Sequence, residues 1–234
     1  MVNNWLTKGQ RANAIPPAIC FLCEDYVDPG HLVCNPCRLD FAVIRRACPR
    51  CGKEVSHANL PCPSCSTRPP RYDHLIAPFH YAYPISLMIK FLKYNNNIEL
   101  SGEFGRALAS AVEARGRPLP EAVVPVPLHP LRAALRGYNQ AGEIARVVAA
   151  QLRLPVELGM VKRTRHTLPQ FNLDPAQRLR NINGAFSFRS GSGCRSVAIV
   201  DDVVTTGTTV NELAGLLKQA GLKTVEVWAC ARAC

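Results

Sequence analysis

The stretch of sequence that decides the fold covers residues 197–209 and reads VAIVDDVVTTGTT. Its four leading apolar residues predict a buried strand, which two adjacent carboxylates, Asp201 and Asp202, follow. A turn rich in threonine and glycine comes next, and a helical pattern over 209–220 continues from it. Successive backbone N–H groups, hydroxyl groups and the positive end of a helix dipole favour a phosphate monoester. The stretch therefore predicts a phosphate-binding turn between a strand and a helix.

The two carboxylates beside this turn add a second preference. Ionised aspartate is a hydrogen-bond acceptor with hard oxygen ligands, so it suits a vicinal diol or a diol-bound Mg²⁺. A ligand that carries a phosphate at one end and a vicinal diol at the other matches ribose 5-phosphate. The plainer alternative is a helix-capped turn with two solvated acids.

The segments around this stretch alternate between two patterns. Apolar runs predict strands at 122–127, 196–200 and 225–230. Amphipathic spacing predicts helices at 85–94, 103–114, 139–153 and 209–220. Alternation of apolar strands and helices is typical of an α/β domain, in which helices cover both faces of a parallel sheet. Ligands of such sheets bind beyond the carboxyl ends of the strands, where the turn lies.

The cysteines mark a second kind of domain. Eight of the eleven form four Cys-x-x-Cys pairs, and each gap between pairs is ten residues long. Such a spacer lets one turn direct two thiolates at a tetrahedral ion, so we expect two Zn²⁺ sites with four cysteine ligands each. The expected ligands are Cys20, Cys23, Cys34, Cys37, Cys48, Cys51, Cys62 and Cys65. Sequential pairing, which the short gaps favour, would give two zinc ribbons; interleaved pairing would give a cross-braced unit, and redox dithiols or buried free thiols are the alternative without metal.

The boundary between the two domains lies where prolines interrupt regular structure. We expect a double zinc-ribbon domain at 16–66, a linker at 67–73 that contains Pro69 and Pro70, and an α/β domain at 74–234. The first segment has few large aliphatic residues, so bound metal must supply most of its folding free energy.

Composition narrows the class of protein further. The chain has 234 residues, a formal net charge of +11 and 47% hydrophobic residues, which excludes a disordered protein and favours anionic partners. The chain has no apolar run of about 18 residues and no secretion signal at its start. We therefore expect a cytoplasmic protein without an integral membrane segment, in which cysteines serve metal binding rather than disulfides.

Residues 197–209 resemble the phosphoribosyl-pyrophosphate (PRPP) signature of type I phosphoribosyltransferases. The four cysteine pairs, the KFLKY segment at 90–94, VPVP at 124–127 and RGYNQ at 136–140 precede it in this order. From about residue 20, the whole chain resembles the ComF/GntX family, in which a zinc module precedes a type I phosphoribosyltransferase-like domain. The resemblance implies a role in natural transformation, in which incoming single-stranded DNA is brought into the cytoplasm.

The resemblance also assigns roles to residues. It implies that the two acids contact the ribose hydroxyls, directly or through Mg²⁺, and that the turn holds the 5-phosphate. The residues implied to bind PRPP are Asp201, Asp202, Val203, Val204, Thr205, Thr206, Gly207, Thr208, Thr209 and Arg136. The turn at 125–130 takes the place of the pyrophosphate loop, but its three prolines lack an N–H, so Arg136 is expected to compensate. The segment 163–180 matches the mobile catalytic loop of the superfamily, where Arg163 or Arg165 would pair with pyrophosphate; a solvated basic loop is the alternative.

Three functions compete. We favour a DNA-uptake protein, peripheral to the inner membrane, that binds PRPP with Mg²⁺ and single-stranded DNA. The basic residues over 132–180, with Tyr138 and Phe171 as base-stacking candidates, support the DNA contact. The alternatives are an active phosphoribosyltransferase, whose acceptor the sequence does not reveal, and a zinc-dependent adaptor that recruits a helicase-type partner and carries a vestigial site.

Overall fold

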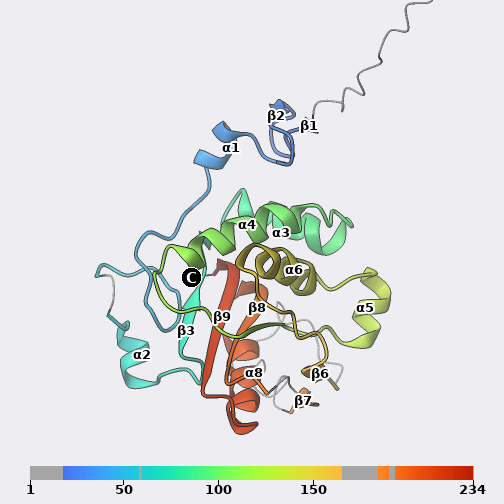
Figure 1. The fold of residues 1–234 in the computed structure, drawn as a ribbon. Helices are drawn as coiled ribbons and strands as arrows, with labels where there is room; N and C mark the ends of the chain where they lie inside the picture. Colours follow the sequence, from blue (N-terminus) through green and yellow to red (C-terminus); the bar gives the residue numbers. More distant parts are fainter. Residues whose placement is uncertain (1–17, 58–59, 165–183, 190–192, 234) are drawn as a thin grey trace, which may run out of the picture. The chain divides into compact units, whose positions relative to one another are not determined.

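The computed structural model describes residues 18–57, 60–164, 184–189 and 193–233. The chain divides into two compact units, Met1–Leu39 and Asp40–Cys234. Each unit has its own cysteine tetrad, and among the residues just given only those of the second unit form a sheet flanked by helices (Figure 1). None of the helices in the described part of the chain combines the length and the apolar character needed to cross a membrane.

The first unit is a short hairpin followed by one helix. Strands β1 (Ala18–Ile19) and β2 (Tyr26–Val27) pair antiparallel, and α1 spans Asn35–Leu39. Buried apolar surface is small here: Cys20 and Val33 are each 1% exposed, whereas Leu39 is 87% exposed. A core of this size cannot hold a chain folded by burial alone, so the unit depends on its metal ligands.

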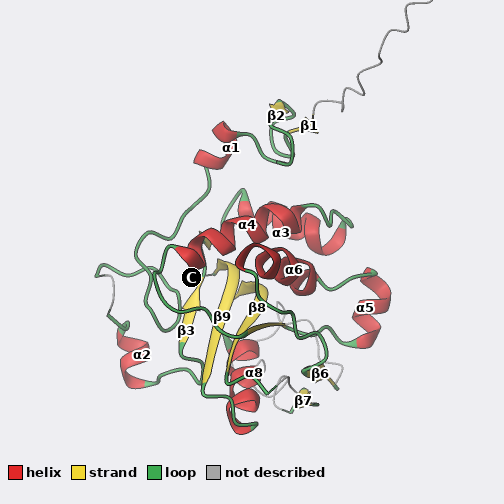
Figure 2. Cartoon of the chain, viewed as in Figure 1, coloured by secondary structure: helices red, strands yellow, loops and turns green. Residues whose placement is uncertain are grey.

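A parallel sheet forms the centre of the second unit. Its strand order is β3-β9-β8-β5, all neighbours are parallel, and β4 pairs with a further part of β9. The strands span, in chain order, β3 (His74–Ile76), β4 (Phe79–His80), β5 (Ala122–Pro125), β8 (Ser196–Val204) and β9 (Thr224–Arg232). Both long strands are buried almost throughout, as expected of a sheet covered on two faces. Figure 2 shows these strands in yellow and the helices around them in red.

Helices cover both faces of this sheet. Figure 1 shows α3, α4 and α6 on one side and α8 on the other. The helices span α2 (Pro63–Thr67), α3 (Ile85–Tyr94), α4 (Leu100–Glu113), α5 (Pro130–Arg136), α6 (Gln140–Leu152) and α8 (Thr208–Gln219). Alternate residues of the strands, such as Ile199 and Val227, pack with Leu213 of α8 in one apolar cluster. A separate antiparallel pair, β6 (Val161–Arg163) and β7 (Phe186–Phe188), completes the described elements.

The predicted α/β class and its order of elements are confirmed, and the architecture is consistent with a type I phosphoribosyltransferase-like domain. The helix expected over 85–94 has those bounds, and the helix after the turn begins at Thr208. The central strand is longer than expected, because it continues to Val204 beside an equally long β9. Both aspartates therefore lie within the strand.

The second cysteine tetrad belongs to the same compact unit as the sheet. Leu75 on β3 donates its N–H to Pro49 O at 3.3 Å, and Ile44 donates its N–H to Pro78 O at 2.8 Å. These contacts join the cysteine-rich segment to the edge of the sheet. The division at 16–66, 67–73 and 74–234 stays a prediction from the sequence.

Candidate functional site

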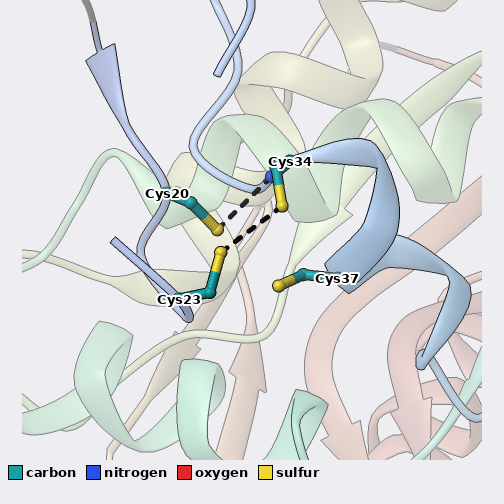
Figure 3. Close-up of side chains that lie close together, drawn as sticks. All are labelled: Cys20, Cys23, Cys34 and Cys37. Atoms are coloured by element: carbon teal, nitrogen blue, oxygen red, sulfur yellow. Dashed lines mark hydrogen bonds between the residues drawn. The ribbon is translucent and has the colours of Figure 1, made fainter. Parts of the chain in front are cut away.

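The first tetrad brings four sulfur atoms to one point. The Sγ atoms of Cys20, Cys23, Cys34 and Cys37 all lie within 4.8 Å of one another, and Figure 3 shows the side chains converging. Cys23 Sγ lies 3.6 Å from Cys34 Sγ. A tetrahedron with Zn–S bonds of about 2.3 Å has edges of about 3.8 Å, so this spacing fits Zn²⁺.

The second tetrad repeats the same geometry. Its members are Cys48, Cys51, Cys62 and Cys65, with Cys51 Sγ 3.7 Å from Cys62 Sγ. In each tetrad the third cysteine donates its backbone N–H to the first: Cys34 N to Cys20 Sγ at 3.4 Å, and Cys62 N to Cys48 Sγ at 3.2 Å. Pairing is therefore sequential, as the ten-residue gaps favoured, and the chain carries two Zn²⁺ sites with four cysteine ligands each.

Backbone N–H groups also prepare the thiolates that zinc needs. Burial opposes ionisation of Cys20, but hydrogen bonds from the N–H groups of Cys34 and Leu22 outweigh it and lower the pKa of Cys20 to about 6. Burial likewise opposes ionisation of Cys48, and the N–H groups around it lower its pKa to about 7. The first ligand of each tetrad is thus ready to bind metal near neutral pH.

The turn over residues 48–52 of the second tetrad, called the zinc knuckle below, packs closely against the sheet at Gly52. Gly52 has φ +69°, and a Cβ there would lie 2.3 Å from Leu75 Cδ2. On the same knuckle, the Arg50 guanidinium donates to Asp73 O at 2.8 Å. The conformational need for glycine was predictable from the sequence, whereas the close packing on β3 follows only from the fold.

The turn between β8 and α8 forms a second candidate site. Gly207 has φ +81° and is the N-cap of α8, so the chain reverses tightly into the helix. Thr206 Oγ1 lies 2.8 Å from Thr208 Oγ1, and Thr208 N donates to Thr206 Oγ1 at 3.4 Å. A small, solvent-open hollow lies here, lined by Asp201, Val203, Val204, Thr205, Gly207, Thr208, Thr209 and Val210.

The two adjacent aspartates have different surroundings, because successive residues of a strand point to opposite faces. Asp201 lines the hollow. Asp202 is 8% exposed and forms an ion pair with Lys93 of α3, with Nζ 2.9 Å from Oδ1. Burial would lower the pKa of Lys93, but the carboxylates of Asp202 and Asp201 outweigh burial and raise it.

Lys93 is a site residue that the sequence prediction missed. The signal was present, since Lys93 follows Ile89 by four residues and so shares the buried face of α3. Its partner lies 109 positions further along the chain, which helical spacing cannot predict.

Asp201 titrates near neutral pH. Burial and the neighbouring Asp202 carboxylate raise the pKa of Asp201 to about 7, although the charges of Lys93 and Arg163 oppose this shift. A carboxyl group in this state binds a diol as acceptor or donor, and it ionises when a cation approaches.

Of the two arginines predicted to pair with pyrophosphate, the structure describes Arg163. Arg163 is the last residue of β6, only 6% exposed, with its guanidinium 5.5 Å from the Phe186 ring centre. The alternative of a solvated basic side chain is therefore wrong for Arg163. Arg165 and Phe171 lie outside the described residues.

Arg136 and the proline-rich turn were expected on the diphosphate side. At the end of α5, the Arg136 guanidinium lies 5.1 Å from the Tyr94 ring centre and donates to Gln140 Oε1 at 3.1 Å. Beyond Pro125, Val126 N donates to Val200 O at 2.9 Å, so this turn begins beside the strand that carries the aspartates. Tyr138, expected to stack on bases, donates its hydroxyl to Leu92 O.

The tetrads and the sheet define a class: a zinc-ribbon protein with a largely parallel α/β domain, an architecture consistent with a phosphoribosyltransferase-like fold. Residues 12–66 match a family model described as "Double zinc ribbon domain". The chain is 35% identical to DNA utilization protein YhgH of Escherichia coli O157:H7 over 221 residues, covering 92% of this chain and 97% of that protein. It is 36% identical to Competence protein F of Haemophilus influenzae over 193 residues, or 80% and 84% of the two chains. The chain belongs to the family of these proteins, which confirms the predicted ComF/GntX membership.

Proposed function

We propose that this protein acts in DNA uptake and utilisation, and that its β8–α8 turn binds phosphoribosyl pyrophosphate with Mg²⁺. The relatives' names, DNA utilization protein and Competence protein F, support the first part. One observation carries the second part: a hollow at the carboxyl end of a parallel strand combines the Asp201 carboxyl with the threonine- and glycine-rich turn.

In this proposal, different residues of the hollow bind different parts of the ligand. The backbone N–H groups and hydroxyls of Thr205 to Thr209 hold the 5-phosphate at the positive end of α8. Asp201 takes the ribose diol, directly or beside Mg²⁺, which would neutralise part of the diphosphate charge. Asp202 points to the opposite face of the sheet, where its carboxylate is paired with Lys93. Asp201 is therefore the aspartate that is available to a ligand in the hollow.

Isothermal titration with phosphoribosyl pyrophosphate and Mg²⁺ tests this proposal. We expect wild-type protein to bind and Asp201→Asn to lose at least about tenfold in affinity, because an amide cannot supply the anionic oxygen. Glu113→Gln, which changes an exposed acid on α4, is the matched control and should bind normally. An Asp201→Asn, Asp202→Asn double variant that binds as well as wild type contradicts the proposal.

An active phosphoribosyltransferase is the alternative use of the same site. Pairing of Arg163 and Arg165 with pyrophosphate stays a prediction in this scheme, and so does diphosphate contact by Arg136. Release of pyrophosphate with a screened acceptor would separate catalysis from ligand sensing. A helicase-type partner and a cytoplasmic location beside the inner membrane also stay predictions.

A specific observation favours single-stranded DNA as a second ligand. Tyr94 is 64% exposed and has the Arg136 guanidinium over its ring, while Lys90 is exposed one turn earlier on α3. An exposed aromatic ring with basic neighbours suits base stacking and phosphate contact.

Fluorescence anisotropy with a labelled oligothymidylate tests this second site. Tyr94→Ala should weaken binding by about tenfold, since base stacking contributes about 1–3 kcal/mol. Tyr83→Ala is the control, because Tyr83 is 71% exposed and lies just before α3. Binding that is equal in both variants, or that does not weaken at high salt, counts against this platform.

A further inference from the structure

A buried arginine joins the second zinc centre to the phosphate turn. Arg232, on β9, is 4% exposed. Its Nε donates to Cys51 O at 2.8 Å, which is the backbone of a zinc ligand. Its Nη1 donates to Val204 O at 2.9 Å and also to Thr205 O, where β8 passes into the turn. One guanidinium therefore holds the zinc knuckle and the entrance of the turn together.

The zinc centre can compensate the buried charge of Arg232. Burying a guanidinium is costly unless negative charge lies nearby. Among the described residues, the hydrogen-bond acceptors of Arg232 are all backbone carbonyl oxygens, including Ala233 O at 2.6 Å. Four thiolates and one Zn²⁺ have a formal net charge of about −2, so the loaded centre compensates the guanidinium.

A second set of contacts also connects the segment after the zinc ligands to α8. Between Cys65 and β3, Arg71 donates its backbone N–H to Asn211 Oδ1 on α8 at 2.7 Å. The next residue, Tyr72, is 4% exposed, and its hydroxyl lies 3.5 Å from the position of a Cβ built on Gly207. The segment that leaves the zinc centre thus packs on the start of α8.

We propose that Arg232 is a positioning residue that couples the second zinc centre to the β8–α8 turn, so that zinc bound there raises the affinity of the turn for a sugar phosphate. This proposal rests on the proposed function, because it takes the turn as the phosphate site. The coupling is reciprocal: a sugar phosphate in the turn must also raise the affinity of Cys48, Cys51, Cys62 and Cys65 for zinc.

Competition for zinc at equilibrium measures this coupling without any enzymatic reaction. In a Cys20→Ser, Cys23→Ser background only the second centre retains zinc, and a coloured chelator reports how much zinc it loses. Ribose 5-phosphate should raise the zinc affinity of this centre by about fivefold. With Arg232→Met added, the protein should still hold one zinc per chain, but ribose 5-phosphate should no longer change the zinc affinity. A merely structural arginine would lower stability and leave the ligand effect intact, and that result overturns the proposal.

Hydrogen exchange of the ligand-free protein provides the independent readout. The amides of 205–209 should exchange at least about tenfold faster in Arg232→Met and in Cys62→Ser, but not in Arg195→Met, which changes an exposed arginine before the other end of β8. If methionine prevents folding, Arg232→Lys keeps the charge and loses the guanidinium fork, and faster exchange is expected there too. Unchanged exchange overturns the coupling. Absence of ribose 5-phosphate binding in wild type contradicts the proposed function instead, and hydrogen exchange then decides the coupling alone.

Discussion

The two zinc tetrads are nearly identical in local chemistry and differ in what surrounds them. Both have two Cys-x-x-Cys pairs, sulfur contacts of 3.6 and 3.7 Å, and the same N–H to Sγ bond from the third cysteine to the first. The first belongs to a compact unit with little apolar core, Met1–Leu39. The second lies in the same unit as the sheet, where Gly52 packs on Leu75. Equal motifs therefore have unequal structural roles: the first stabilises its own small unit, and the second is part of the α/β domain.

Removing each tetrad separately should have the largest effect. Cys48→Ser, Cys51→Ser should lower the free energy of unfolding of the α/β domain by about 4 kcal/mol or more, and its Tm by about 10 °C, because metal binding contributes folding free energy. Cys20→Ser, Cys23→Ser should leave that transition unchanged. Fluorescence of Trp228, which is fully buried on β9, reports the transition in a Trp5→Phe background. Equal losses in the two variants would remove the distinction between the tetrads.

Two glycines allow a finer version of the same comparison. Gly30 in the first unit has φ +85° with no atom within 4 Å of a built Cβ, whereas a Cβ on Gly52 overlaps Leu75. Gly30→Ala should cost only the strain of a positive φ, about 1 kcal/mol. Gly52→Ala adds steric overlap and should cost about 2–4 kcal/mol in chemical denaturation. Similar costs at the two positions would show that the knuckle does not pack on β3.

The pH dependence of ligand binding should follow Asp201 and not the first tetrad. Because burial raises the pKa of Asp201 to about 7, its carboxylate is fully available only above that pH. Affinity for ribose 5-phosphate with Mg²⁺ should rise about tenfold from pH 6 to pH 8 by calorimetry. The rise should persist in Cys20→Ser, Cys23→Ser and shrink in Asp201→Asn to the part due to the phosphate's own ionisation.

The same pKa shift has a consequence for the ligand-free protein, with the opposite sign. A carboxyl group whose pKa is raised by folding is ionised more easily in the unfolded chain, so stability falls as pH increases from about 4 to about 7. Asp201→Asn should remove this slope. Parallel slopes in the two proteins would contradict the assignment of the titration to Asp201.

The smallest effect is expected at the edge of the zinc knuckle. Arg50→Met removes the hydrogen bond to Asp73 O and should destabilise the α/β domain by about 1 kcal/mol, since a partly buried hydrogen bond contributes little more than this. Denaturation monitored by Trp228 fluorescence would detect it, and an unchanged midpoint would assign the packing of the knuckle to Gly52 and Arg232 alone.

Sequence patterns predicted the parts that local rules determine. The cysteine spacing gave the two tetrads because each pair needs only one turn, and the apolar period of 85–94 gave α3 with its observed bounds. The strand and the helix on either side of the Thr-Gly turn were predictable for the same reason. These features lie within short stretches of chain, where residue type and spacing are sufficient.

Long-range partners were not predictable in this way. β3 and β4 have three and two residues, too few for a periodic pattern, and they form because β9 offers a long edge. The partnership of Lys93 with Asp202 and of Arg232 with Cys51 joins residues far apart in sequence. For both pairs, the sequence shows only a charged residue within an apolar segment. This pattern predicts that the charged residue has a partner, but it does not predict which residue the partner is.

A crystal structure with phosphoribosyl pyrophosphate and Mg²⁺ tests the central claim most directly. We predict the 5-phosphate on the N–H groups of Thr205 to Thr209 and the ribose hydroxyls at Asp201, with Asp202 still paired to Lys93. A hollow that stays empty at saturating ligand, or is closed by its own side chains, would contradict the claim that this turn is a sugar-phosphate site.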